Sequence, residues 1–499
     1  MSKKRIMAFM LFLALLGSST RVLHTEAKAE ETNMIPGYTW MQPLPDSGVL
    51  LNKTYNSERS INDADSYSRF ILPEMFGAVG DGITDDSAAI ELAATKGPLY
   101  CGDKEYYIKN TITVYNSIVG GRFHLQKDAT IKIQKDNCTL ENCEFYRDEL
   151  PSDAEDRGRW AVIVSNSKKA TITNCYFHDL VSCLYLDRCN DAAVSYNLFE
   201  NCPQTAKGGN GYGVLLIESN RVTISNNSFI NVARHSIYLS NDNSAYNTNI
   251  LISDNTFEWN ENITGNRTGF ESTIEIRPSK NIRIVGNYFN NMFTMCTVSR
   301  QPITVDEKTI VSSTSELYIL NNIGFFDQRY RRDGVIFFSG SSYEEFPSAE
   351  HIIIKGNIID TNTHFVRADY FDDLRIENND ITLRGESTAL VYVEEKFSDM
   401  IQDLSIADNT IDLNEGTLFK INKQAKNTSR NHLGNLIIQN NYVEDLESIL
   451  SLSGEDYSFN TVSCINNFLI YCMNAKENES RISAKKIYSN GNYSYKSKK

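Results

Sequence analysis

Ionisable and aromatic side chains gather in the stretch "INVARHSIYLSND", residues 230 to 242, where Arg234, His235 and Tyr238 stand within five positions. Arg277 follows in the next apolar segment, "TIEIRPS". β-Elimination from a uronate needs a cation for the carboxylate, a base for the C5 proton and an acid for the leaving oxygen. Arginine suits the first role, histidine or tyrosine the second, and tyrosine the third. We therefore predict these four as the catalytic residues.

A repeat predicts the elements that position them. Segments such as "TISNNSF", "RIVGNYF" and "RIENNDI" recur, mostly 22 to 35 residues apart, with two or three short strands in each interval. This spacing is typical of a parallel β-solenoid with one coil per repeat, here about a dozen coils. Asparagine tolerates left-handed backbone, and stacked asparagines can hydrogen-bond between coils. The predicted repeat positions are Asn142, Asn174, Asn197, Asn227, Asn255, Asn287, Asn322, Asn357, Asn379, Asn409 and Asn441.

The segment "FGAVGDGITDDSAAIELAATKG", residues 76 to 97, precedes the repeat. Its glycines allow tight turns, residues 84–86 can start a helix, and residues 88–94 form one apolar helical face. We predict a helix that caps the N-terminal end of the solenoid. The segment resembles the N-terminal motif of the pectate-lyase-like superfamily, and with the repeat the resemblance covers roughly residues 73 to 495. It implies an all-β, single-stranded right-handed parallel β-helix, a fold that this superfamily uses for lyases, hydrolases, epimerases and phage tailspikes.

Strand alternation assigns side chains to the two surfaces of the coils, because successive residues point to opposite faces. The strand that lies about ten residues before each asparagine gives a uniformly apolar inward set. The inward set is Val162, Val164, Leu184, Leu186, Leu215, Ile217, Ile237, Leu239, Ile274, Ile276, Ile336 and Phe338. The outward set is Tyr185, Asp187, Glu218, Tyr238, Glu275, Arg277, Arg367, Asp369, Tyr392 and Glu394.

Outward residues on neighbouring coils lie about 5 Å apart. Tyr238 is therefore predicted beside Glu275 and within reach of Glu218 and Arg277, with Arg234 and His235 at the rim. Further positive charge comes from the "QRYRRD" insertion, with Arg329, Arg331 and Arg332. The predicted substrate-binding residues are Glu275, Lys280, Arg300, Tyr185, Arg367 and Tyr392.

The patch resembles that of the chondroitinase-B and alginate lyase group, in which a lysine on one coil and an Arg-His pair on the next frame the site. Arg277 or Lys280 stands here in place of the lysine, but "ARHS" lies on the preceding coil, so the order differs. In that group carboxylates also hold calcium. The resemblance implies a Ca²⁺ site formed by Glu218, Glu275 and Asp187.

Three other functions remain open. A hydrolase of the polygalacturonase type needs paired carboxylates, for which Asp187, Glu218 and Glu275 are candidates, although the strand motifs of that family are missing. A uronate C5-epimerase uses the same proton abstraction as a lyase. A solenoid that only binds surfaces, as an adhesin, needs no catalytic groups. The favoured prediction is a polysaccharide lyase acting on an acidic, uronate-containing polymer such as a glycosaminoglycan or alginate.

The chain termini and composition suggest where such an enzyme works. A basic start, an apolar run and small residues up to Ala29 predict a signal peptide over residues 1–29. An extension over 30–72 and a catalytic β-helix domain over 73–497 follow. Removing the signal peptide lowers the net charge from −14 to about −18, which argues against nucleic acid as a partner. We predict a secreted monomer without membrane contact, whose ten cysteines are stacked or free thiols, with one or two disulfides as the alternative.

Overall fold

The computed structural model describes residues 70–151, 158–205, 209–241, 245–260, 272–305, 308–327, 334–339, 349–395, 402–423, 431–453, 457–471 and 483–496. They belong to a compact unit that runs from Ser68 to Lys499. The predicted signal peptide, nearly all of the extension, and the three arginines of "QRYRRD" lie outside the described residues. Within the described part, no helix has the length and apolar character needed to cross a membrane.

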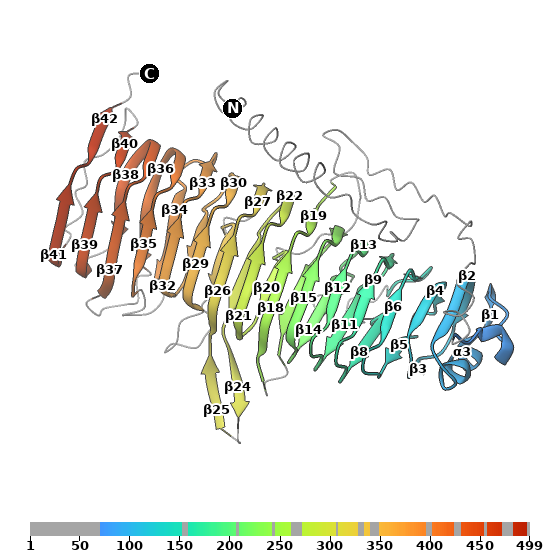
Figure 1. The fold of residues 1–499 in the computed structure, drawn as a ribbon. Helices are drawn as coiled ribbons and strands as arrows, with labels where there is room; N and C mark the ends of the chain where they lie inside the picture. The colour runs from blue at the N-terminus through green and yellow to red at the C-terminus, as the bar shows by residue number, and fades with distance from the viewer. Residues whose placement is uncertain are drawn as a thin grey trace, which may run out of the picture. The chain divides into compact units, whose positions relative to one another are not determined.

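The N-terminal end of the solenoid carries the predicted helix. This end of the solenoid consists of η1 (Pro73–Phe76), β1 (Asp81–Asp85), α3 (Ser87–Ala94) and β2 (Leu99–Ile108), and α3 is the predicted helix. Asp86 is the N-cap residue and makes no side-chain capping bond; the carboxylate of the preceding Asp85 accepts the backbone N–H of Ser87 at 3.1 Å. Ile90, Ala93 and Ala94 are buried against the first coils. The capping helix is confirmed (Figure 1).

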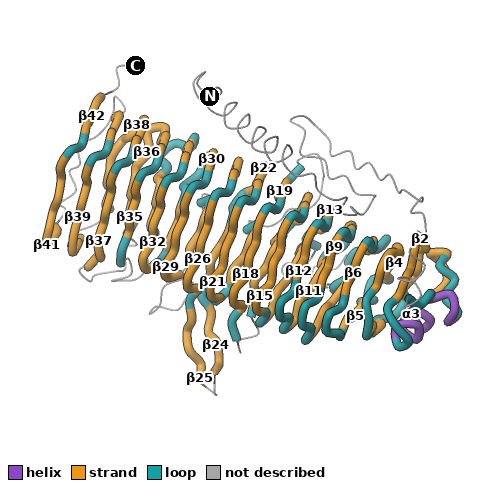
Figure 2. The backbone as a smooth tube through the Cα atoms, in the orientation of Figure 1, coloured by secondary structure: helices purple, strands orange, loops and turns teal. Residues whose placement is uncertain are grey.

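Forty strands of the described residues join in one sheet with parallel pairings, and successive coils repeat three faces joined by turns (Figure 2). The first face consists of β3 (Ile112–Val114), β5 (Ile131–Ile133), β8 (Val162–Ser165), β11 (Ser182–Asp187), β14 (Tyr212–Ile217), β17 (His235–Ser240), β20 (Ile274–Ile276), β23 (Cys296–Ser299), β28 (Ile336–Ser339), β31 (Val366–Ala368) and β34 (Ala389–Glu395). Its strands pair in this order.

The second face consists of β6 (Thr139–Glu141), β9 (Thr171–Thr173), β12 (Ala193–Ser195), β15 (Asn220–Ser225), β18 (Asn247–Ser253), β21 (Ser279–Val285), β26 (Thr314–Leu320), β29 (Ala349–Lys355), β32 (Asp372–Glu377), β35 (Leu404–Ala407), β37 (Asn431–Gln439), β39 (Tyr457–Ile465) and β41 (Ser483–Asn490).

The third face consists of β7 (Glu144–Tyr146), β10 (Tyr176–His178), β13 (Leu198–Cys202), β16 (Ser228–Val232), β19 (Thr256–Glu258), β22 (Tyr288–Met292), β27 (Ile323–Phe326), β30 (Ile358–Thr361), β33 (Asp380–Leu383), β40 (Phe468–Tyr471) and β42 (Tyr493–Lys496). The longer strands β4 (Ile118–Leu125), β36 (Thr410–Lys423) and β38 (Tyr442–Ser453) turn from one face into the next. β24 (Gln301–Val305) and β25 (Lys308–Ser312) form a separate antiparallel pair that leaves the stack (Figure 1).

A ladder of buried asparagines runs along the turn between the second and third faces. From Asn227 onward, each amide oxygen accepts both the backbone N–H and the side-chain N–H of the asparagine one coil earlier. Asn287 does so for Asn255 at 3.0 Å in both bonds, and its own Nδ2 donates to the Ile252 carbonyl. The ladder comprises Asn197, Asn227, Asn255, Asn287, Asn322, Asn357, Asn379, Asn409, Asn441, Asn467 and Asn492. The predicted bonding between coils is confirmed.

Two predicted ladder members are wrong. Asn142 and Asn174 have φ of 56° and 53°, and they precede the ladder position instead of occupying it. Cys143 and Cys175 fill that position, and the Cys175 N–H donates to the amide oxygen of Asn197 at 2.9 Å. Left-handed backbone therefore belongs to the residue before the ladder, and the ladder begins on two buried thiols.

The cysteines of the described residues carry no disulfide. Eight of these nine thiols are buried, including Cys143 and Cys175, which were predicted as small stacked core residues. The Sγ atoms of Cys183 and Cys202 lie 3.1 Å apart. Free thiols agree with the favoured prediction.

The core is a stack of phenylalanines on the third face. Neighbouring rings, from Phe123 and Phe145 through to Phe289 and Phe326, have centroids 4.8–5.7 Å apart. They are fully or almost fully buried. The rings from Phe123 to Phe289 stand at one register and so align these coils with one another. In the next coil Gly324 takes that register, and Phe326 follows two residues later.

The predicted inward register is correct for most coils and wrong for β14. Val214 and Leu216 point into the core there, with no exposed surface. Leu215 instead pairs with Tyr185 and Tyr238 in the outward row, and Ile217 is likewise on the outward side. The run Val-Leu-Leu-Ile is apolar on both faces, so alternation alone cannot fix its register.

Candidate active site

The outward row of the first face brings the predicted catalytic groups together. Tyr185, Leu215, Tyr238 and Glu275 pair in succession on β11, β14, β17 and β20. The predicted contact between Tyr238 and Glu275 is confirmed in register. We call Arg234, His235, Tyr238, Glu275 and Arg277 the Tyr238 patch.

Arg277 connects the two central side chains of the patch. Its Nε donates to the Tyr238 hydroxyl at 3.3 Å and lies 3.4 Å from Oε1 of Glu275. The guanidinium carbon is 6.0 Å from the Tyr238 ring centroid. Burial lowers the pKa of Arg277, but Glu275 and Tyr238 more than offset this and raise it. The guanidinium is thus a permanent positive charge beside the phenol oxygen.

Glu275 is held by two serines that the sequence reasoning missed. Ser272 donates to Oε2 at 3.0 Å and Ser299 donates to Oε1 at 2.9 Å. The carboxylate is 6% exposed. Hydrogen bonds from both sides and the adjacent Arg277 allow this buried group to stay ionised. No sequence signal identified the serines, because they enter from a turn and from the next coil.

His235 is a buried, neutral base. It is 2% exposed, and its Nδ1 lies 2.8 Å from the carbonyl oxygen of Ser272. Burial, together with the charges of Arg234 and Arg277, lowers the pKa of His235 to about 3, against the opposing effect of the Ser272 hydrogen bond. Because a neutral ring facing a carbonyl must carry its proton on Nδ1, Nε2 holds the lone pair.

Tyr212, at the start of β14, completes the patch and was not predicted. Its ring stacks on His235 at 5.6 Å and is tilted against Tyr238 at the same centroid distance. The guanidinium of Arg234 lies 5.5 Å from the Tyr212 centroid. Tyr212 pairs directly with His235 in register, so the corrected alignment of β14 would have found it.

The predicted substrate-binding residues are spread over different parts of the fold. Arg367 and Tyr392 pair on the same outward row. They lie four and five strands beyond Tyr238, so the usual strand spacing places them about 19 and 24 Å from it. Lys280 lies on the second face, where it pairs with Thr248 and contacts the Tyr246 ring at 4.4 Å.

The other two predicted substrate-binding residues, Arg300 and Tyr185, differ in their exposure to solvent. Arg300 has no exposed surface, so it is not presented to a polymer in solvent. Tyr185 is half-exposed on the outward row next to the Tyr238 patch. Glu275, the last member of the predicted set, belongs to the patch itself.

The three carboxylates implied for calcium do not form one cluster. Glu218 lies in a turn with φ of 49° and accepts the backbone N–H of Ala245. Asp187 pairs with Arg188 at 2.6 Å, and Glu275 with Arg277. Across the described ranges, no group of three or more His, Cys, Asp or Glu side chains is arranged to hold a metal ion.

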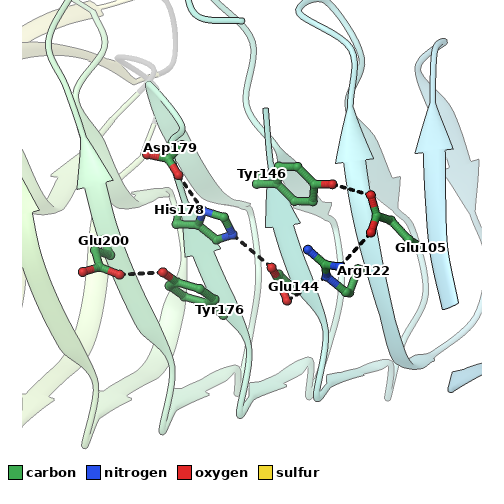
Figure 3. A network of polar contacts seen from close by, with 8 residues as sticks. All are labelled: Glu105, Arg122, Glu144, Tyr146, Tyr176, His178, Asp179 and Glu200. Carbon is green, nitrogen blue, oxygen red and sulfur yellow. Dashed lines mark hydrogen bonds and ion pairs between the residues drawn. The ribbon is translucent and has the colours of Figure 1, made fainter. Parts of the chain in front are cut away.

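A second polar network occupies the third face of the N-terminal coils (Figure 3). Glu144 contacts Arg122 at 3.2 Å and His178 at 3.2 Å, and Arg122 also reaches Glu105. The pKa of His178 is raised by Asp179 and Glu144 although burial lowers it. Sequence reasoning missed this network, although strand alternation in "ENCEFYRD" and "TNCYFHDL" was available to find it.

The rings of this network stack on one another. The centroids of Tyr146 and His178 are 5.3 Å apart with planes 6° apart, and Tyr176 lies 4.2 Å from His178. The hydroxyls of Tyr146 and Tyr176 donate to Glu105 and Glu200. The side chains therefore satisfy one another, which is typical of a ladder that stabilises adjacent coils.

Known proteins share the fold at low sequence identity. Residues 106–323 match the family model described as right handed beta helix region. No curated protein sequence is significantly similar to the chain. The fold of the chain is thus a right-handed parallel β-helix.

Three solved structures illustrate the likeness. The Streptococcus pneumoniae surface adhesin PfbA is 14% identical over 83% of this chain and 100% of its own, with a TM-score of 0.45. A mutant tailspike protein of E. coli bacteriophage HK620, in complex with pentasaccharide, is 11% identical over 88% and 84%, with a TM-score of 0.49. The catalytic domain of a GH87 alpha-1,3-glucanase, in complex with nigerose, is 11% identical over 85% and 68%, with a TM-score of 0.50. At 11% identity, the likeness to the glucanase domain shows the fold alone.

Proposed function

We propose that the protein is a polysaccharide lyase that cleaves a uronate-containing polymer by β-elimination at the Tyr238 patch. One observation carries the proposal: the Tyr238 hydroxyl accepts a hydrogen bond from Arg277, 3.3 Å away, on the outward side of the coils. A guanidinium beside a phenol oxygen stabilises negative charge on that oxygen. A tyrosine placed in this way can both accept and return a proton.

In the proposed reaction, Tyr238 carries the proton from C5 to the leaving oxygen. The C5–H bond breaks and its proton passes to the phenolate oxygen. The electron pair forms the C4=C5 double bond as the C4–O bond breaks, and the leaving oxygen takes the proton from the phenol. Arg277 stabilises the phenolate, and we assign Arg234, at the rim, to the uronate carboxylate.

His235 takes a positioning role in this scheme. With a pKa of about 3, its imidazole is too weak a base to abstract a carbon-bound proton at neutral pH. Its ring lies 5.1 Å from the Tyr238 ring and is fixed by the Ser272 carbonyl. The histidine ring thus packs against the tyrosine ring and fixes its orientation.

A substrate panel tests the reaction class. The wild-type protein is incubated with alginate, chondroitin sulfate, dermatan sulfate, hyaluronan and pectate, with and without a chelator, and ultraviolet absorbance and reducing ends are followed. Elimination produces a conjugated double bond that absorbs, and at least one polymer should give it. New reducing ends without absorbance would indicate a hydrolase instead, and changed uronate stereochemistry at constant length an epimerase. Activity that disappears with chelator would support the predicted calcium.

A conservative variant tests the assignment of Tyr238. Tyr238→Phe keeps the ring and removes the hydroxyl, so turnover should fall at least about a hundredfold, since proton transfer contributes about 10² to 10⁴ in rate. Tyr442→Phe is the matched control, because that hydroxyl binds Glu444 on the third face. Equal turnover by the wild type and Tyr238→Phe would exclude the tyrosine as the proton carrier.

A further inference from the structure

Aromatic rings continue from the Tyr238 patch toward the N-terminal coils. Trp160 stacks on Tyr212 with centroids 5.8 Å apart and planes at 10°, and it is tilted against Tyr185 at 5.5 Å. Tyr212 in turn contacts His235 and Tyr238. The rings therefore form one continuous run from the coil of β8 to the coil of β17.

A small residue lets the tryptophan cross a coil. Trp160 precedes β8, and β8 pairs with β11, which lies between it and the Tyr212 strand. The β11 residue in register with Tyr212 is Ser182. Its short side chain is buried and donates to the Val181 carbonyl. The indole of Trp160 thus reaches the Tyr212 ring over this position.

The backbone that carries Trp160 is held by a buried arginine. Arg147 is 3% exposed, and its guanidinium donates to the carbonyls of Arg159 at 2.8 Å and Trp160 at 3.4 Å. Thr130 donates to the Trp160 carbonyl as well, at 2.8 Å. Fixing a side chain before a ligand arrives reduces the entropy cost of binding. The indole is therefore presented in a preset position.

We propose that Trp160 and Tyr185 form a sugar-binding subsite next to the Tyr238 patch, which rests on the proposed lyase function. Both side chains are half-exposed, whereas Tyr212 between them and His235 is 6% exposed. Half-exposed aromatic rings offer an apolar surface with a polar edge, which suits the C–H faces and hydroxyls of a pyranose. The bound polymer then runs along the stack of coils, with the bond to be cleaved at Tyr238 and neighbouring sugars over Trp160 and Tyr185.

Subsite variants separate binding from chemistry. Trp160→Ala and Tyr185→Leu should each raise KM, and Kd measured by calorimetry, about tenfold for the polymer that the panel identifies, while kcat changes less than twofold. Tyr185→Leu keeps apolar volume and leaves the backbone held by Arg147 untouched, so it remains informative if Trp160→Ala fails to fold. Phe468→Ala, from the exposed pair with Tyr442 on the third face, is the control and should bind like the wild type.

The outcomes distinguish this inference from the proposed function. If both variants bind and turn over the polymer like the wild type while Tyr238→Phe is inactive, the subsite is wrong and the lyase stands. If the wild type cleaves none of the polymers, their binding is followed by tryptophan fluorescence in the wild type and in Trp160→Phe. A change in the wild type that Trp160→Phe loses supports the subsite without a lyase, and no difference overturns it.

Discussion

Arg277 holds its guanidinium between a carboxylate and a phenol, with Nε 3.4 Å from Glu275 and 3.3 Å from Tyr238. The sequence predicted this meeting from strand alternation, because Tyr238, Glu275 and Arg277 all point outward from adjacent strands. It did not predict Ser272, Ser299 or Tyr212. Ser272 precedes its strand and Tyr212 begins a strand of ambiguous register, where alternation carries little information. Ser299 ends β23, a strand that the alignment of coils did not include.

Glu275 fixes the arginine that acts on Tyr238. Glu275→Gln keeps the shape of the side chain but removes its charge, so the guanidinium is no longer held against the phenol. Its amide oxygen can still accept from one of the two serines, whereas its amide nitrogen cannot accept from the other. We expect kcat to fall about tenfold, or about 1.4 kcal/mol in transition-state stabilisation, with little change in KM. Steady-state kinetics measures this. Glu377→Gln, from an ion pair with Lys355 on the second face, should match the wild type, and a changed KM at constant kcat would assign Glu275 to substrate binding instead.

Buried His235 makes stability depend on pH in a defined direction. Its pKa is about 3 in the folded protein against an ordinary 6.5, so below pH 6.5 the unfolded chain binds a proton that the folded protein does not. Stability is then constant above this range and falls by about 1.4 kcal/mol per pH unit between pH 6.5 and 3. The difference in unfolding free energy between the wild type and His235→Gln should shrink from pH 7 to pH 4.5. Urea titrations that give a constant difference would contradict a buried neutral imidazole.

At the level of elements, the asparagine repeat predicted most of the ladder but misplaced its first members. The spacing of the motif is the same whether asparagine occupies the ladder or the left-handed residue before it. Asn142 and Asn174 are of the second kind, and the following cysteines take the ladder position. The pattern fixes the period of the coils, while the exact ladder residue depends on which side chain reaches the next coil.

Removing one ladder amide should weaken the stack. In Asn287→Ala, the backbone and side-chain N–H groups of Asn255 and the Ile252 carbonyl lose their partners. Buried groups without partners cost about 1–3 kcal/mol each, so we expect at least about 2 kcal/mol lower unfolding free energy by urea titration. Asn290→Ala, in the same coil, removes a side chain that donates to Glu258 at 3.3 Å, and it should cost under about 1 kcal/mol. Equal losses in the two variants would mean that the ladder adds no special stability.

For the whole molecule, the solenoid and its capping helix followed from the repeat and one N-terminal segment, whereas the site depends on side chains that meet across coils. The chain also carries a net charge of −14. A uronate polymer is repelled by that charge at long range and attracted only locally by Arg234 and Arg277. Substrate encounter should therefore depend on ionic strength.

Added salt should speed encounter with a polyanion. The screening length falls from about 30 Å at 0.01 M to about 10 Å at 0.1 M, which removes long-range repulsion more than contacts at the patch. We expect kcat/KM to rise severalfold between these concentrations, with kcat nearly constant. A steady fall over the same range would show that local attraction by the arginines governs encounter.

The most direct test of the central claim compares the wild type with Tyr238→Phe on the polymer that the panel selects, in one experiment that follows ultraviolet absorbance after saturating substrate is added. We predict a steady rise in absorbance from the wild type, a rate at least about a hundredfold lower from the variant, and equal affinity of the two for the polymer by calorimetry. Equal rates of absorbance increase from the two proteins would contradict β-elimination at Tyr238.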